Sequence, residues 1–183
     1  PVFLQTLHVA RGWPIAMISA AITAHYLLSA GLIAGLPDIH RRFGLARTTL
    51  AGGVLSAIGV IGWSQATELW MLFVAILPSA VGWALLSGAA INAMVAPWFD
   101  RDRPKAVSLA FNGASVGGIV FVPLWVFLIA ELGFSVAAIL IAIATVAVLG
   151  WISLRVLRHN PQSLGLHPDG RASDGTAPSV SPL

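Results

Sequence analysis

The sequence predicts an all-α, polytopic membrane protein, and two observations support this fold class. The chain of 183 residues is 57% hydrophobic and only 9% charged, whereas about 25% of the residues of a soluble domain are charged. The apolar residues also form long runs between short charged clusters. Because about 20 helical residues cross the roughly 30 Å hydrocarbon core of a bilayer, these runs predict a transmembrane helical bundle over residues 1–158.

The first two predicted spans cover about residues 15–36 and 48–64. We expect Pro37 to end the first span, since proline is not tolerated well inside a helix, and a basic loop to follow it. Four glycines lie along the second span, and glycine in a membrane helix lets neighbouring backbones approach closely. Residues 1–7 are too few to span and are interpreted as the end of a helix whose beginning is missing.

Three more apolar runs complete the predicted bundle. We expect Pro78 to interrupt the first of them and Pro123 to kink the second. In the second run, Gly113 and Gly117 have the GxxxG spacing that is typical of closely packed membrane helices. The three predicted spans cover about residues 70–96, 106–130 and 134–154.

A compact charged hinge, residues 98–105, separates the third and fourth predicted spans. It opens with the aromatic pair Trp98 and Phe99, and five of its last six residues are charged. Charge this dense is not stable in hydrocarbon, and aromatic side chains favour the headgroup level. The hinge is therefore predicted to be a short loop on one membrane face.

The basic residues predict the orientation of the five spans. Nine of the ten Lys and Arg residues fall in alternate loops and in the tail, and only Arg11 falls on the opposite face. The positive-inside rule assigns the nine to the cytoplasm. We thus expect a multi-pass protein of the cell (inner or plasma) membrane. Residues 159–183 are rich in Pro, Ser, Gly and Asp and are predicted to form a flexible cytoplasmic linker or tail.

The composition argues against several classes of function. Ten Lys and Arg residues against seven Asp and Glu residues, in scattered clusters, do not form the basic face that a nucleic-acid-binding protein needs. The chain has no cysteine, and the five predicted spans contain no Asp, Glu, Lys or Arg. We predict no enzyme activity, catalytic residue, metal site or cofactor, because one histidine and scattered serines do not supply a nucleophile with its base.

The hinge and the helix after it resemble the major facilitator superfamily, in its monocarboxylate-transporter and oxalate:formate-antiporter-like branch. Two further stretches also resemble this branch: residues 160–170, NPQSLGLHPDG, and the pair Phe43–Gly44 followed by Arg47. Arg41 departs from the branch, because its position, three before the glycine, usually holds an acidic residue. Around the hinge, the matching residues are Trp98, Phe99, Arg101, Ala106, Ala110 and Gly113, and the departures are Asp102, Lys105, Ser108 and Asn112.

This resemblance implies half of a twelve-helix fold, with the five spans as helices two to six of an N-terminal half. It implies a secondary active transporter of a small solute, such as a mono- or dicarboxylate anion, that works by alternating access. The implied partners are the lipid bilayer, the substrate and the missing C-terminal half, which would supply the cation for an organic anion. The alternative is a non-transporting membrane scaffold or assembly subunit whose helices pack without a cavity.

Two polar residues within the spans are candidate substrate-binding residues. His25 lies near the middle of the first span, where an ionisable side chain tends to face a cavity or a partner. It could contact substrate or carry a proton, or it could be a neutral ring bonded to a neighbouring helix. Tyr26 is adjacent and is expected to point away from any cavity that His25 lines. Asn92 could contact substrate or could join helices by hydrogen bonds.

The candidate gating residues lie at the cytoplasmic face. They could form salt bridges that break and form during transport, or they could act only as topology determinants and packing residues. The resembled family carries an acidic residue in the loop after its second helix, three positions before the glycine. In this chain Asp38 is the acidic residue close to that position, but it is out of register. The full set is Asp38, Arg41, Gly44, Arg47, Asp100, Arg101, Asp102, Arg103 and Asn112.

Overall fold

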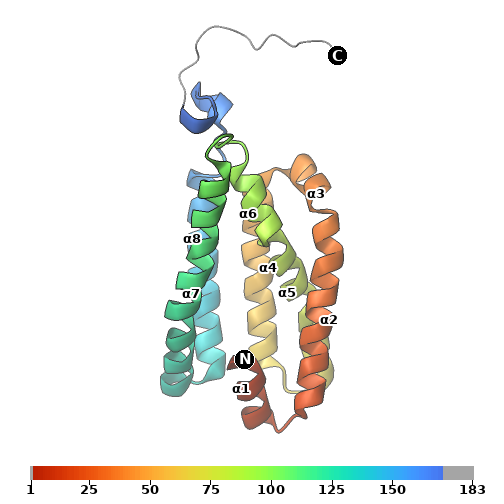
Figure 1. Ribbon diagram of the computed structural model, residues 1–183. Coiled ribbons are helices and arrows are strands. Elements are labelled where there is room, and N and C mark those ends of the chain that lie inside the picture. The colour runs from red at the N-terminus through yellow and green to blue at the C-terminus, as the bar shows by residue number, and fades with distance from the viewer. Residues whose placement is uncertain (1, 171–183) are drawn as a thin grey trace.

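The computed structural model describes residues 2–170, and these residues fold into helices joined by short connections, without a β-strand. Figure 1 shows the long helices running side by side as a bundle. The predicted all-α fold is confirmed. The elements are α1 (Val2–Arg11), α2 (Ile15–Ala34), α3 (Leu36–Phe43), α4 (Leu45–Gln65), α5 (Leu69–Leu85), α6 (Gly88–Val95), α7 (Arg103–Leu132), α8 (Phe134–Arg155) and the short 3-10 helices η1 (Pro161–Leu164) and η2 (Pro168–Gly170).

Five helical segments of the described chain are long and apolar enough to cross a membrane. Four of them are single helices, α2, α4, α7 and α8, and the fifth is α5 together with α6. They follow one another in the order of the five predicted spans. The boundaries differ by a few residues: α4 begins at Leu45, and α7 begins at Arg103, so the last basic residues of the hinge are already helical.

The centre of the bundle is α4, which packs against α5 on one side and α8 on the other, while α2 packs against α5. Small residues make the α4–α5 contact close. A Cβ atom at Gly59 would lie 2.6 Å from Cα of Ser79, and one at Gly62 would lie 2.8 Å from Cβ of Ala75. These glycines therefore set the separation of α4 and α5, as the glycine content of the second span predicts.

The short helix α1 closes one end of the bundle. Leu7 is fully buried and belongs to one apolar cluster with Ile18 of α2 and Leu72 of α5. Figure 1 shows α1 at the end of the bundle opposite α3 and the 3-10 helices.

The third span is interrupted at a different place from the one predicted. Pro78 lies inside α5, which continues unbroken to Leu85. The break comes at Leu86 and Ser87, where Ser87 adopts an extended backbone with ψ 171° before α6 begins. A proline inside a membrane helix is tolerated where neighbouring groups satisfy the freed backbone, so its presence alone does not fix a break.

Two other local predictions differ from the structure. Pro37 does not end the first span: α2 ends at Ala34, Gly35 caps it, and Pro37 lies in the first turn of α3. Proline fits this position because the first-turn N–H groups of a helix have no carbonyl partner. Gly113 and Gly117 were predicted to pack closely, but no atom of a neighbouring helix would lie within 4 Å of a Cβ atom at either position among the described residues.

The segment after α8 contains two short 3-10 helices. Residues 161–164 and 168–170 form η1 and η2, and the backbone N–H of Asp169 donates to the carbonyl of Trp98 at 2.9 Å. The first part of the predicted linker thus contacts the hinge. The rest of that predicted linker, residues 171–183, lies outside the described residues.

Candidate functional site

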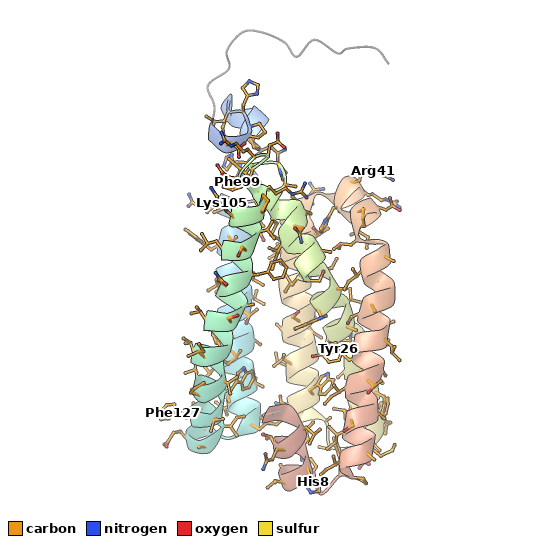
Figure 2. All side chains as sticks on the ribbon, viewed as in Figure 1. His8, Tyr26, Arg41, Phe99, Lys105 and Phe127 are labelled. Carbon is orange, nitrogen blue, oxygen red and sulfur yellow. The ribbon has the colours of Figure 1, made fainter. Side chains whose placement is uncertain are left out.

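A cavity of about 340 Å³ opens between α2, α4 and α5. Its walls are mainly aromatic, and no charged side chain is among the residues that line it. Figure 2 places Tyr26, one of these residues, midway along the bundle, away from the basic end that carries Arg41. The lining residues are Ile22, His25 and Tyr26 from α2, Val60 and Trp63 from α4, and Ser79 and Trp83 from α5.

Ser79 holds His25 in the wall of this cavity. Its hydroxyl donates to the carbonyl of Ile76 at 3.1 Å, and the indole N–H of Trp63 donates to it at 3.2 Å. Nδ1 of His25 lies 3.0 Å from the same oxygen. A hydroxyl has one proton to donate and two positions at which it accepts. The proton of Ser79 is donated to the carbonyl of Ile76, so Ser79 can only accept from His25, and Nδ1 of His25 is the donor. A neutral His25 in this arrangement keeps Nε2 as a hydrogen-bond acceptor.

Aromatic rings surround the imidazole of His25 edge to face. Its ring centroid lies 5.2 Å from that of Tyr26 and 6.3 Å from those of Trp63 and Trp83. Tyr26 and Trp83 also contact each other, with centroids 5.9 Å apart. The prediction that Tyr26 points away from the cavity of His25 is therefore wrong. The two adjacent side chains of α2 lie at the wall of the same cavity.

A buried hydroxyl fixes α2 against α5 one turn beyond His25. Ser29 is 1% exposed, and its Oγ lies within hydrogen-bond distance of the carbonyl of Ala80, at 3.1 Å, and of the carbonyl of His25, at 2.8 Å. The contact with Ala80 joins the two helices directly. Gly59 lets the backbone of α4 approach Ser79 on the other side. The helices that supply His25 and Ser79 are thus held in register.

Asn92, the second candidate substrate-binding residue, lies elsewhere. It belongs to α6, and its side-chain N–H donates to the carbonyl of Gly88 in the same helix at 2.9 Å. It does not line the cavity of His25. The structure therefore does not bring the two candidate residues together, and sequence reasoning missed Trp63, Ser79 and Trp83, which share the cavity with His25.

The candidate gating residues lie at the end of the bundle that carries α3 and the hinge, where Figure 2 labels Arg41 and Lys105. Asp38 pairs with Arg41 at 2.9 Å, and Asp102 pairs with Lys105 at 3.0 Å. Both pairs are exposed and join residues three apart in one segment, so neither links α3 to the hinge.

Within the described residues, none of the other candidate gating residues forms an ion pair with another helix. Gly44 has a φ of 80° between α3 and α4, a conformation that glycine adopts without strain. Arg47, Asp100, Arg101, Arg103 and Asn112 are exposed.

One histidine of α3 has an environment that the sequence reasoning missed. Nε2 of His40 is buried and has no hydrogen-bond partner among the described residues. Burial lowers the pKa of His40 below its usual 6.5, because a charged ring loses solvation there. In the sequence, His40 stands next to the charged residues Arg41 and Arg42, which do not indicate a buried position. Within residues 2–170, no group of three His, Asp or Glu side chains could hold a metal ion.

The profile of the Major Facilitator Superfamily matches residues 1–179. Monocarboxylate transporter 13 of Bos taurus is 32% identical over 102 residues, 55% of this chain and 24% of the relative. MFS transporter asaE of Aspergillus flavus is 28% identical over 146 residues, 79% of this chain and 32% of the relative. Monocarboxylate transporter 11 of Mus musculus is 28% identical over 143 residues, 78% of this chain and 29% of the relative.

No solved structure matches the chain. The chain spans about a quarter to a third of the length of these curated relatives. The family profile nevertheless covers nearly all of its residues, including the hinge and the cavity. The match over nearly the whole chain, together with the helical bundle, shows that the chain belongs to the Major Facilitator Superfamily.

Proposed function

We propose that this chain is one helical bundle of a secondary active transporter that moves a small organic anion, such as a mono- or dicarboxylate, by alternating access. Transport in general is supported by the family and by relatives that are named transporters. A second bundle, part of the same transporter, would face this one across the substrate. The charged hinge and α3 would face the cytoplasm, in line with the positive-inside rule.

The observation that carries the proposal is the cavity around His25. A scaffold subunit whose helices only pack together has no need of a cavity of about 340 Å³ lined by a histidine and three other aromatic side chains. Ligand sites in membrane bundles are commonly lined by apolar and aromatic side chains with a few polar groups that fix orientation. The proposed substrate contact is therefore His25, with Ser79 as the residue that orients it.

The hydrogen bonds of His25 link substrate binding to a proton. With Nδ1 donating to Ser79, a neutral ring offers only the acceptor Nε2 to the cavity, which does not bind a carboxylate. Protonation at Nε2 turns it into a charged donor, and a carboxylate accepts from such a donor strongly. In this proposal an anion enters the cavity together with a proton on His25, and Asn92 contributes nothing to that contact.

The test is uptake of radiolabelled mono- and dicarboxylates into proteoliposomes by the full-length transporter and its His25→Ala variant. We expect uptake per molecule to fall far more than the yield of folded protein. Thr23→Ala is the matched control, because Thr23 is exposed on the same helix and bonds only within it. Equal uptake per molecule by His25→Ala and by the control eliminates His25 as a site residue.

A further inference from the structure

The strap, residues 159–170, folds back from the end of α8 onto the loop between α6 and α7. Figure 1 shows the two 3-10 helices of the strap beside that loop, at the basic end of the bundle. The contact is made by Asp169, which is 67 to 69 positions away from its partners in the sequence. It is thus a long-range contact between two segments that each leave the membrane-spanning part of the bundle.

The carboxylate of Asp169 accepts hydrogen bonds from three consecutive backbone N–H groups. Oδ1 accepts from Asp100 at 3.1 Å and from Asp102 at 3.3 Å, and Oδ2 accepts from Arg101 at 2.9 Å. The backbone N–H of Asp169 in turn donates to the carbonyl of Trp98 at 2.9 Å. Four hydrogen bonds from one residue therefore define the backbone of the hinge.

This contact holds the turn that leads into α7, while the side chain of the N-cap residue is engaged elsewhere. Asp102 is the N-cap residue of α7, but its side chain makes no capping hydrogen bond and pairs with Lys105 instead. The N–H groups of Asp100, Arg101 and Asp102 lie before the first residue of α7, so the hydrogen bonds of that helix do not include them. An ionised carboxylate is a stronger acceptor for them than a neutral group, and here Asp169 supplies it from outside the helix.

The strap has a fixed shape that presents this carboxylate. Asp169 has a φ of 62°, in the left-handed region that few residues other than glycine adopt. Gly165 also has a positive φ, 67°, and Leu166 donates to the carbonyl of Pro161 at 2.9 Å. An uncommon backbone conformation persists where surrounding contacts hold it, which indicates that the strap is built around its contact with the hinge.

We infer that Asp169 is a positioning residue for transport, which joins the chain after α8 to the start of α7. The inference rests on the proposed function, because its consequence is for the transport cycle. Through the three N–H groups, movement of the strap is transmitted to the cytoplasmic end of α7, and the hinge that carries Arg101 and Arg103 moves with it. Loss of the carboxylate uncouples the two segments while the bundle remains folded.

The experiment compares Asp169→Asn with Glu131→Gln in the full-length protein, by amide hydrogen exchange in lipid nanodiscs and by uptake into proteoliposomes. Glu131→Gln removes the same charge at the opposite end of the bundle, in the last turn of α7. We expect the N–H groups of residues 100–102 to exchange on the order of tenfold faster in Asp169→Asn, the factor for one lost hydrogen bond to a charged group. Exchange within α4 should match the wild type.

Unchanged exchange at residues 100–102 in Asp169→Asn overturns the strap contact. Faster exchange with uptake per molecule equal to that of Glu131→Gln overturns the positioning role of Asp169 in transport. Faster exchange with reduced uptake in Asp169→Asn alone supports the inference. Absence of uptake by the wild-type protein contradicts the proposed function instead. In that case the exchange measurement alone shows whether Asp169 binds the N–H groups of residues 100–102.

Discussion

Substitution of Gly59 by alanine tests whether close approach of α4 and α5 holds the bundle together. A Cβ atom at this position would lie 2.6 Å from Cα and 2.8 Å from N of Ser79. Favourable contacts between such atoms lie at about 3.5–4.0 Å, so the two helices must separate by about 1 Å at this point. The nearest blocking atom is Cβ of Ser79, whose position is set by the backbone together with Cα and N, so no side-chain rotation relieves the contact.

The magnitude follows from overpacking at the largest helix contact of the bundle. Added methylene groups in a well-packed interior typically cost about 1–3 kcal/mol, and we expect Gly59→Ala to fall in the upper part of this range. The alanine gains up to about 1 kcal/mol from helix propensity, which does not offset a backbone contact. Displacement of Ser79 also weakens its hydrogen bonds to His25 and Trp63.

The assay is the free energy of unfolding in mixed detergent micelles, measured for Gly59→Ala and for the control Gly113→Ala. Gly113 lies on α7 with nothing within 4 Å of its Cβ position, so the control gains helix propensity without a clash. Gly113→Ala should be as stable as the wild type or slightly more stable. If Gly59→Ala were no less stable than Gly113→Ala, the α4–α5 contact would not be as close as described.

Two further predictions concern single polar side chains. Ser29→Ala removes the buried hydroxyl that contacts the carbonyl of Ala80, and we expect a loss of about 0.5–2 kcal/mol in the free energy of unfolding, with Thr23→Ala as the control. Burial lowers the pKa of His40 below the 6.5 of the unfolded chain, so the unfolded state binds more protons as the pH falls through 6.5. The contribution of His40 to stability is therefore complete above pH 6.5 and is lost below it. His40→Gln should reduce this pH dependence, and an identical pH dependence in both proteins would contradict the burial of the ring.

The sequence predicted the number and order of the long helices because hydropathy alone determines which segments prefer lipid. For His25 the sequence left two possibilities open, a cavity or a hydrogen bond to a neighbouring helix, and in the structure the ring lines a cavity and bonds to Ser79 of α5. The break at Leu86 and Ser87 could not be predicted, because neither residue is a helix breaker and the nearby Pro78 was the stronger local signal. The contact of Asp169 with the hinge was also missed, although the segment that contains it was identified, because a carboxylate does not indicate which distant N–H groups it binds.

The glycines show why helix packing is harder to predict than helix position. α4 and α7 are both apolar helices with closely spaced glycines, yet only those of α4 contact another helix. The difference lies in the partner. The small residues Ser56, Gly59 and Gly62 of α4 meet Gly82, Ser79 and Ala75 of α5, in antiparallel order.

Close approach therefore needs two stripes of small residues with matching spacing, one on each helix, because a large side chain on either helix keeps the backbones apart. Gly113 and Gly117 of α7 have the spacing, but no second stripe faces them among the described residues. A GxxxG pattern thus permits close packing without determining where it occurs. The sequence contains the small residues of α4 and those of α5 as two separate patterns. Only the matching of Ser56 with Gly82 and of Gly62 with Ala75 in the structure identifies the two helices as partners.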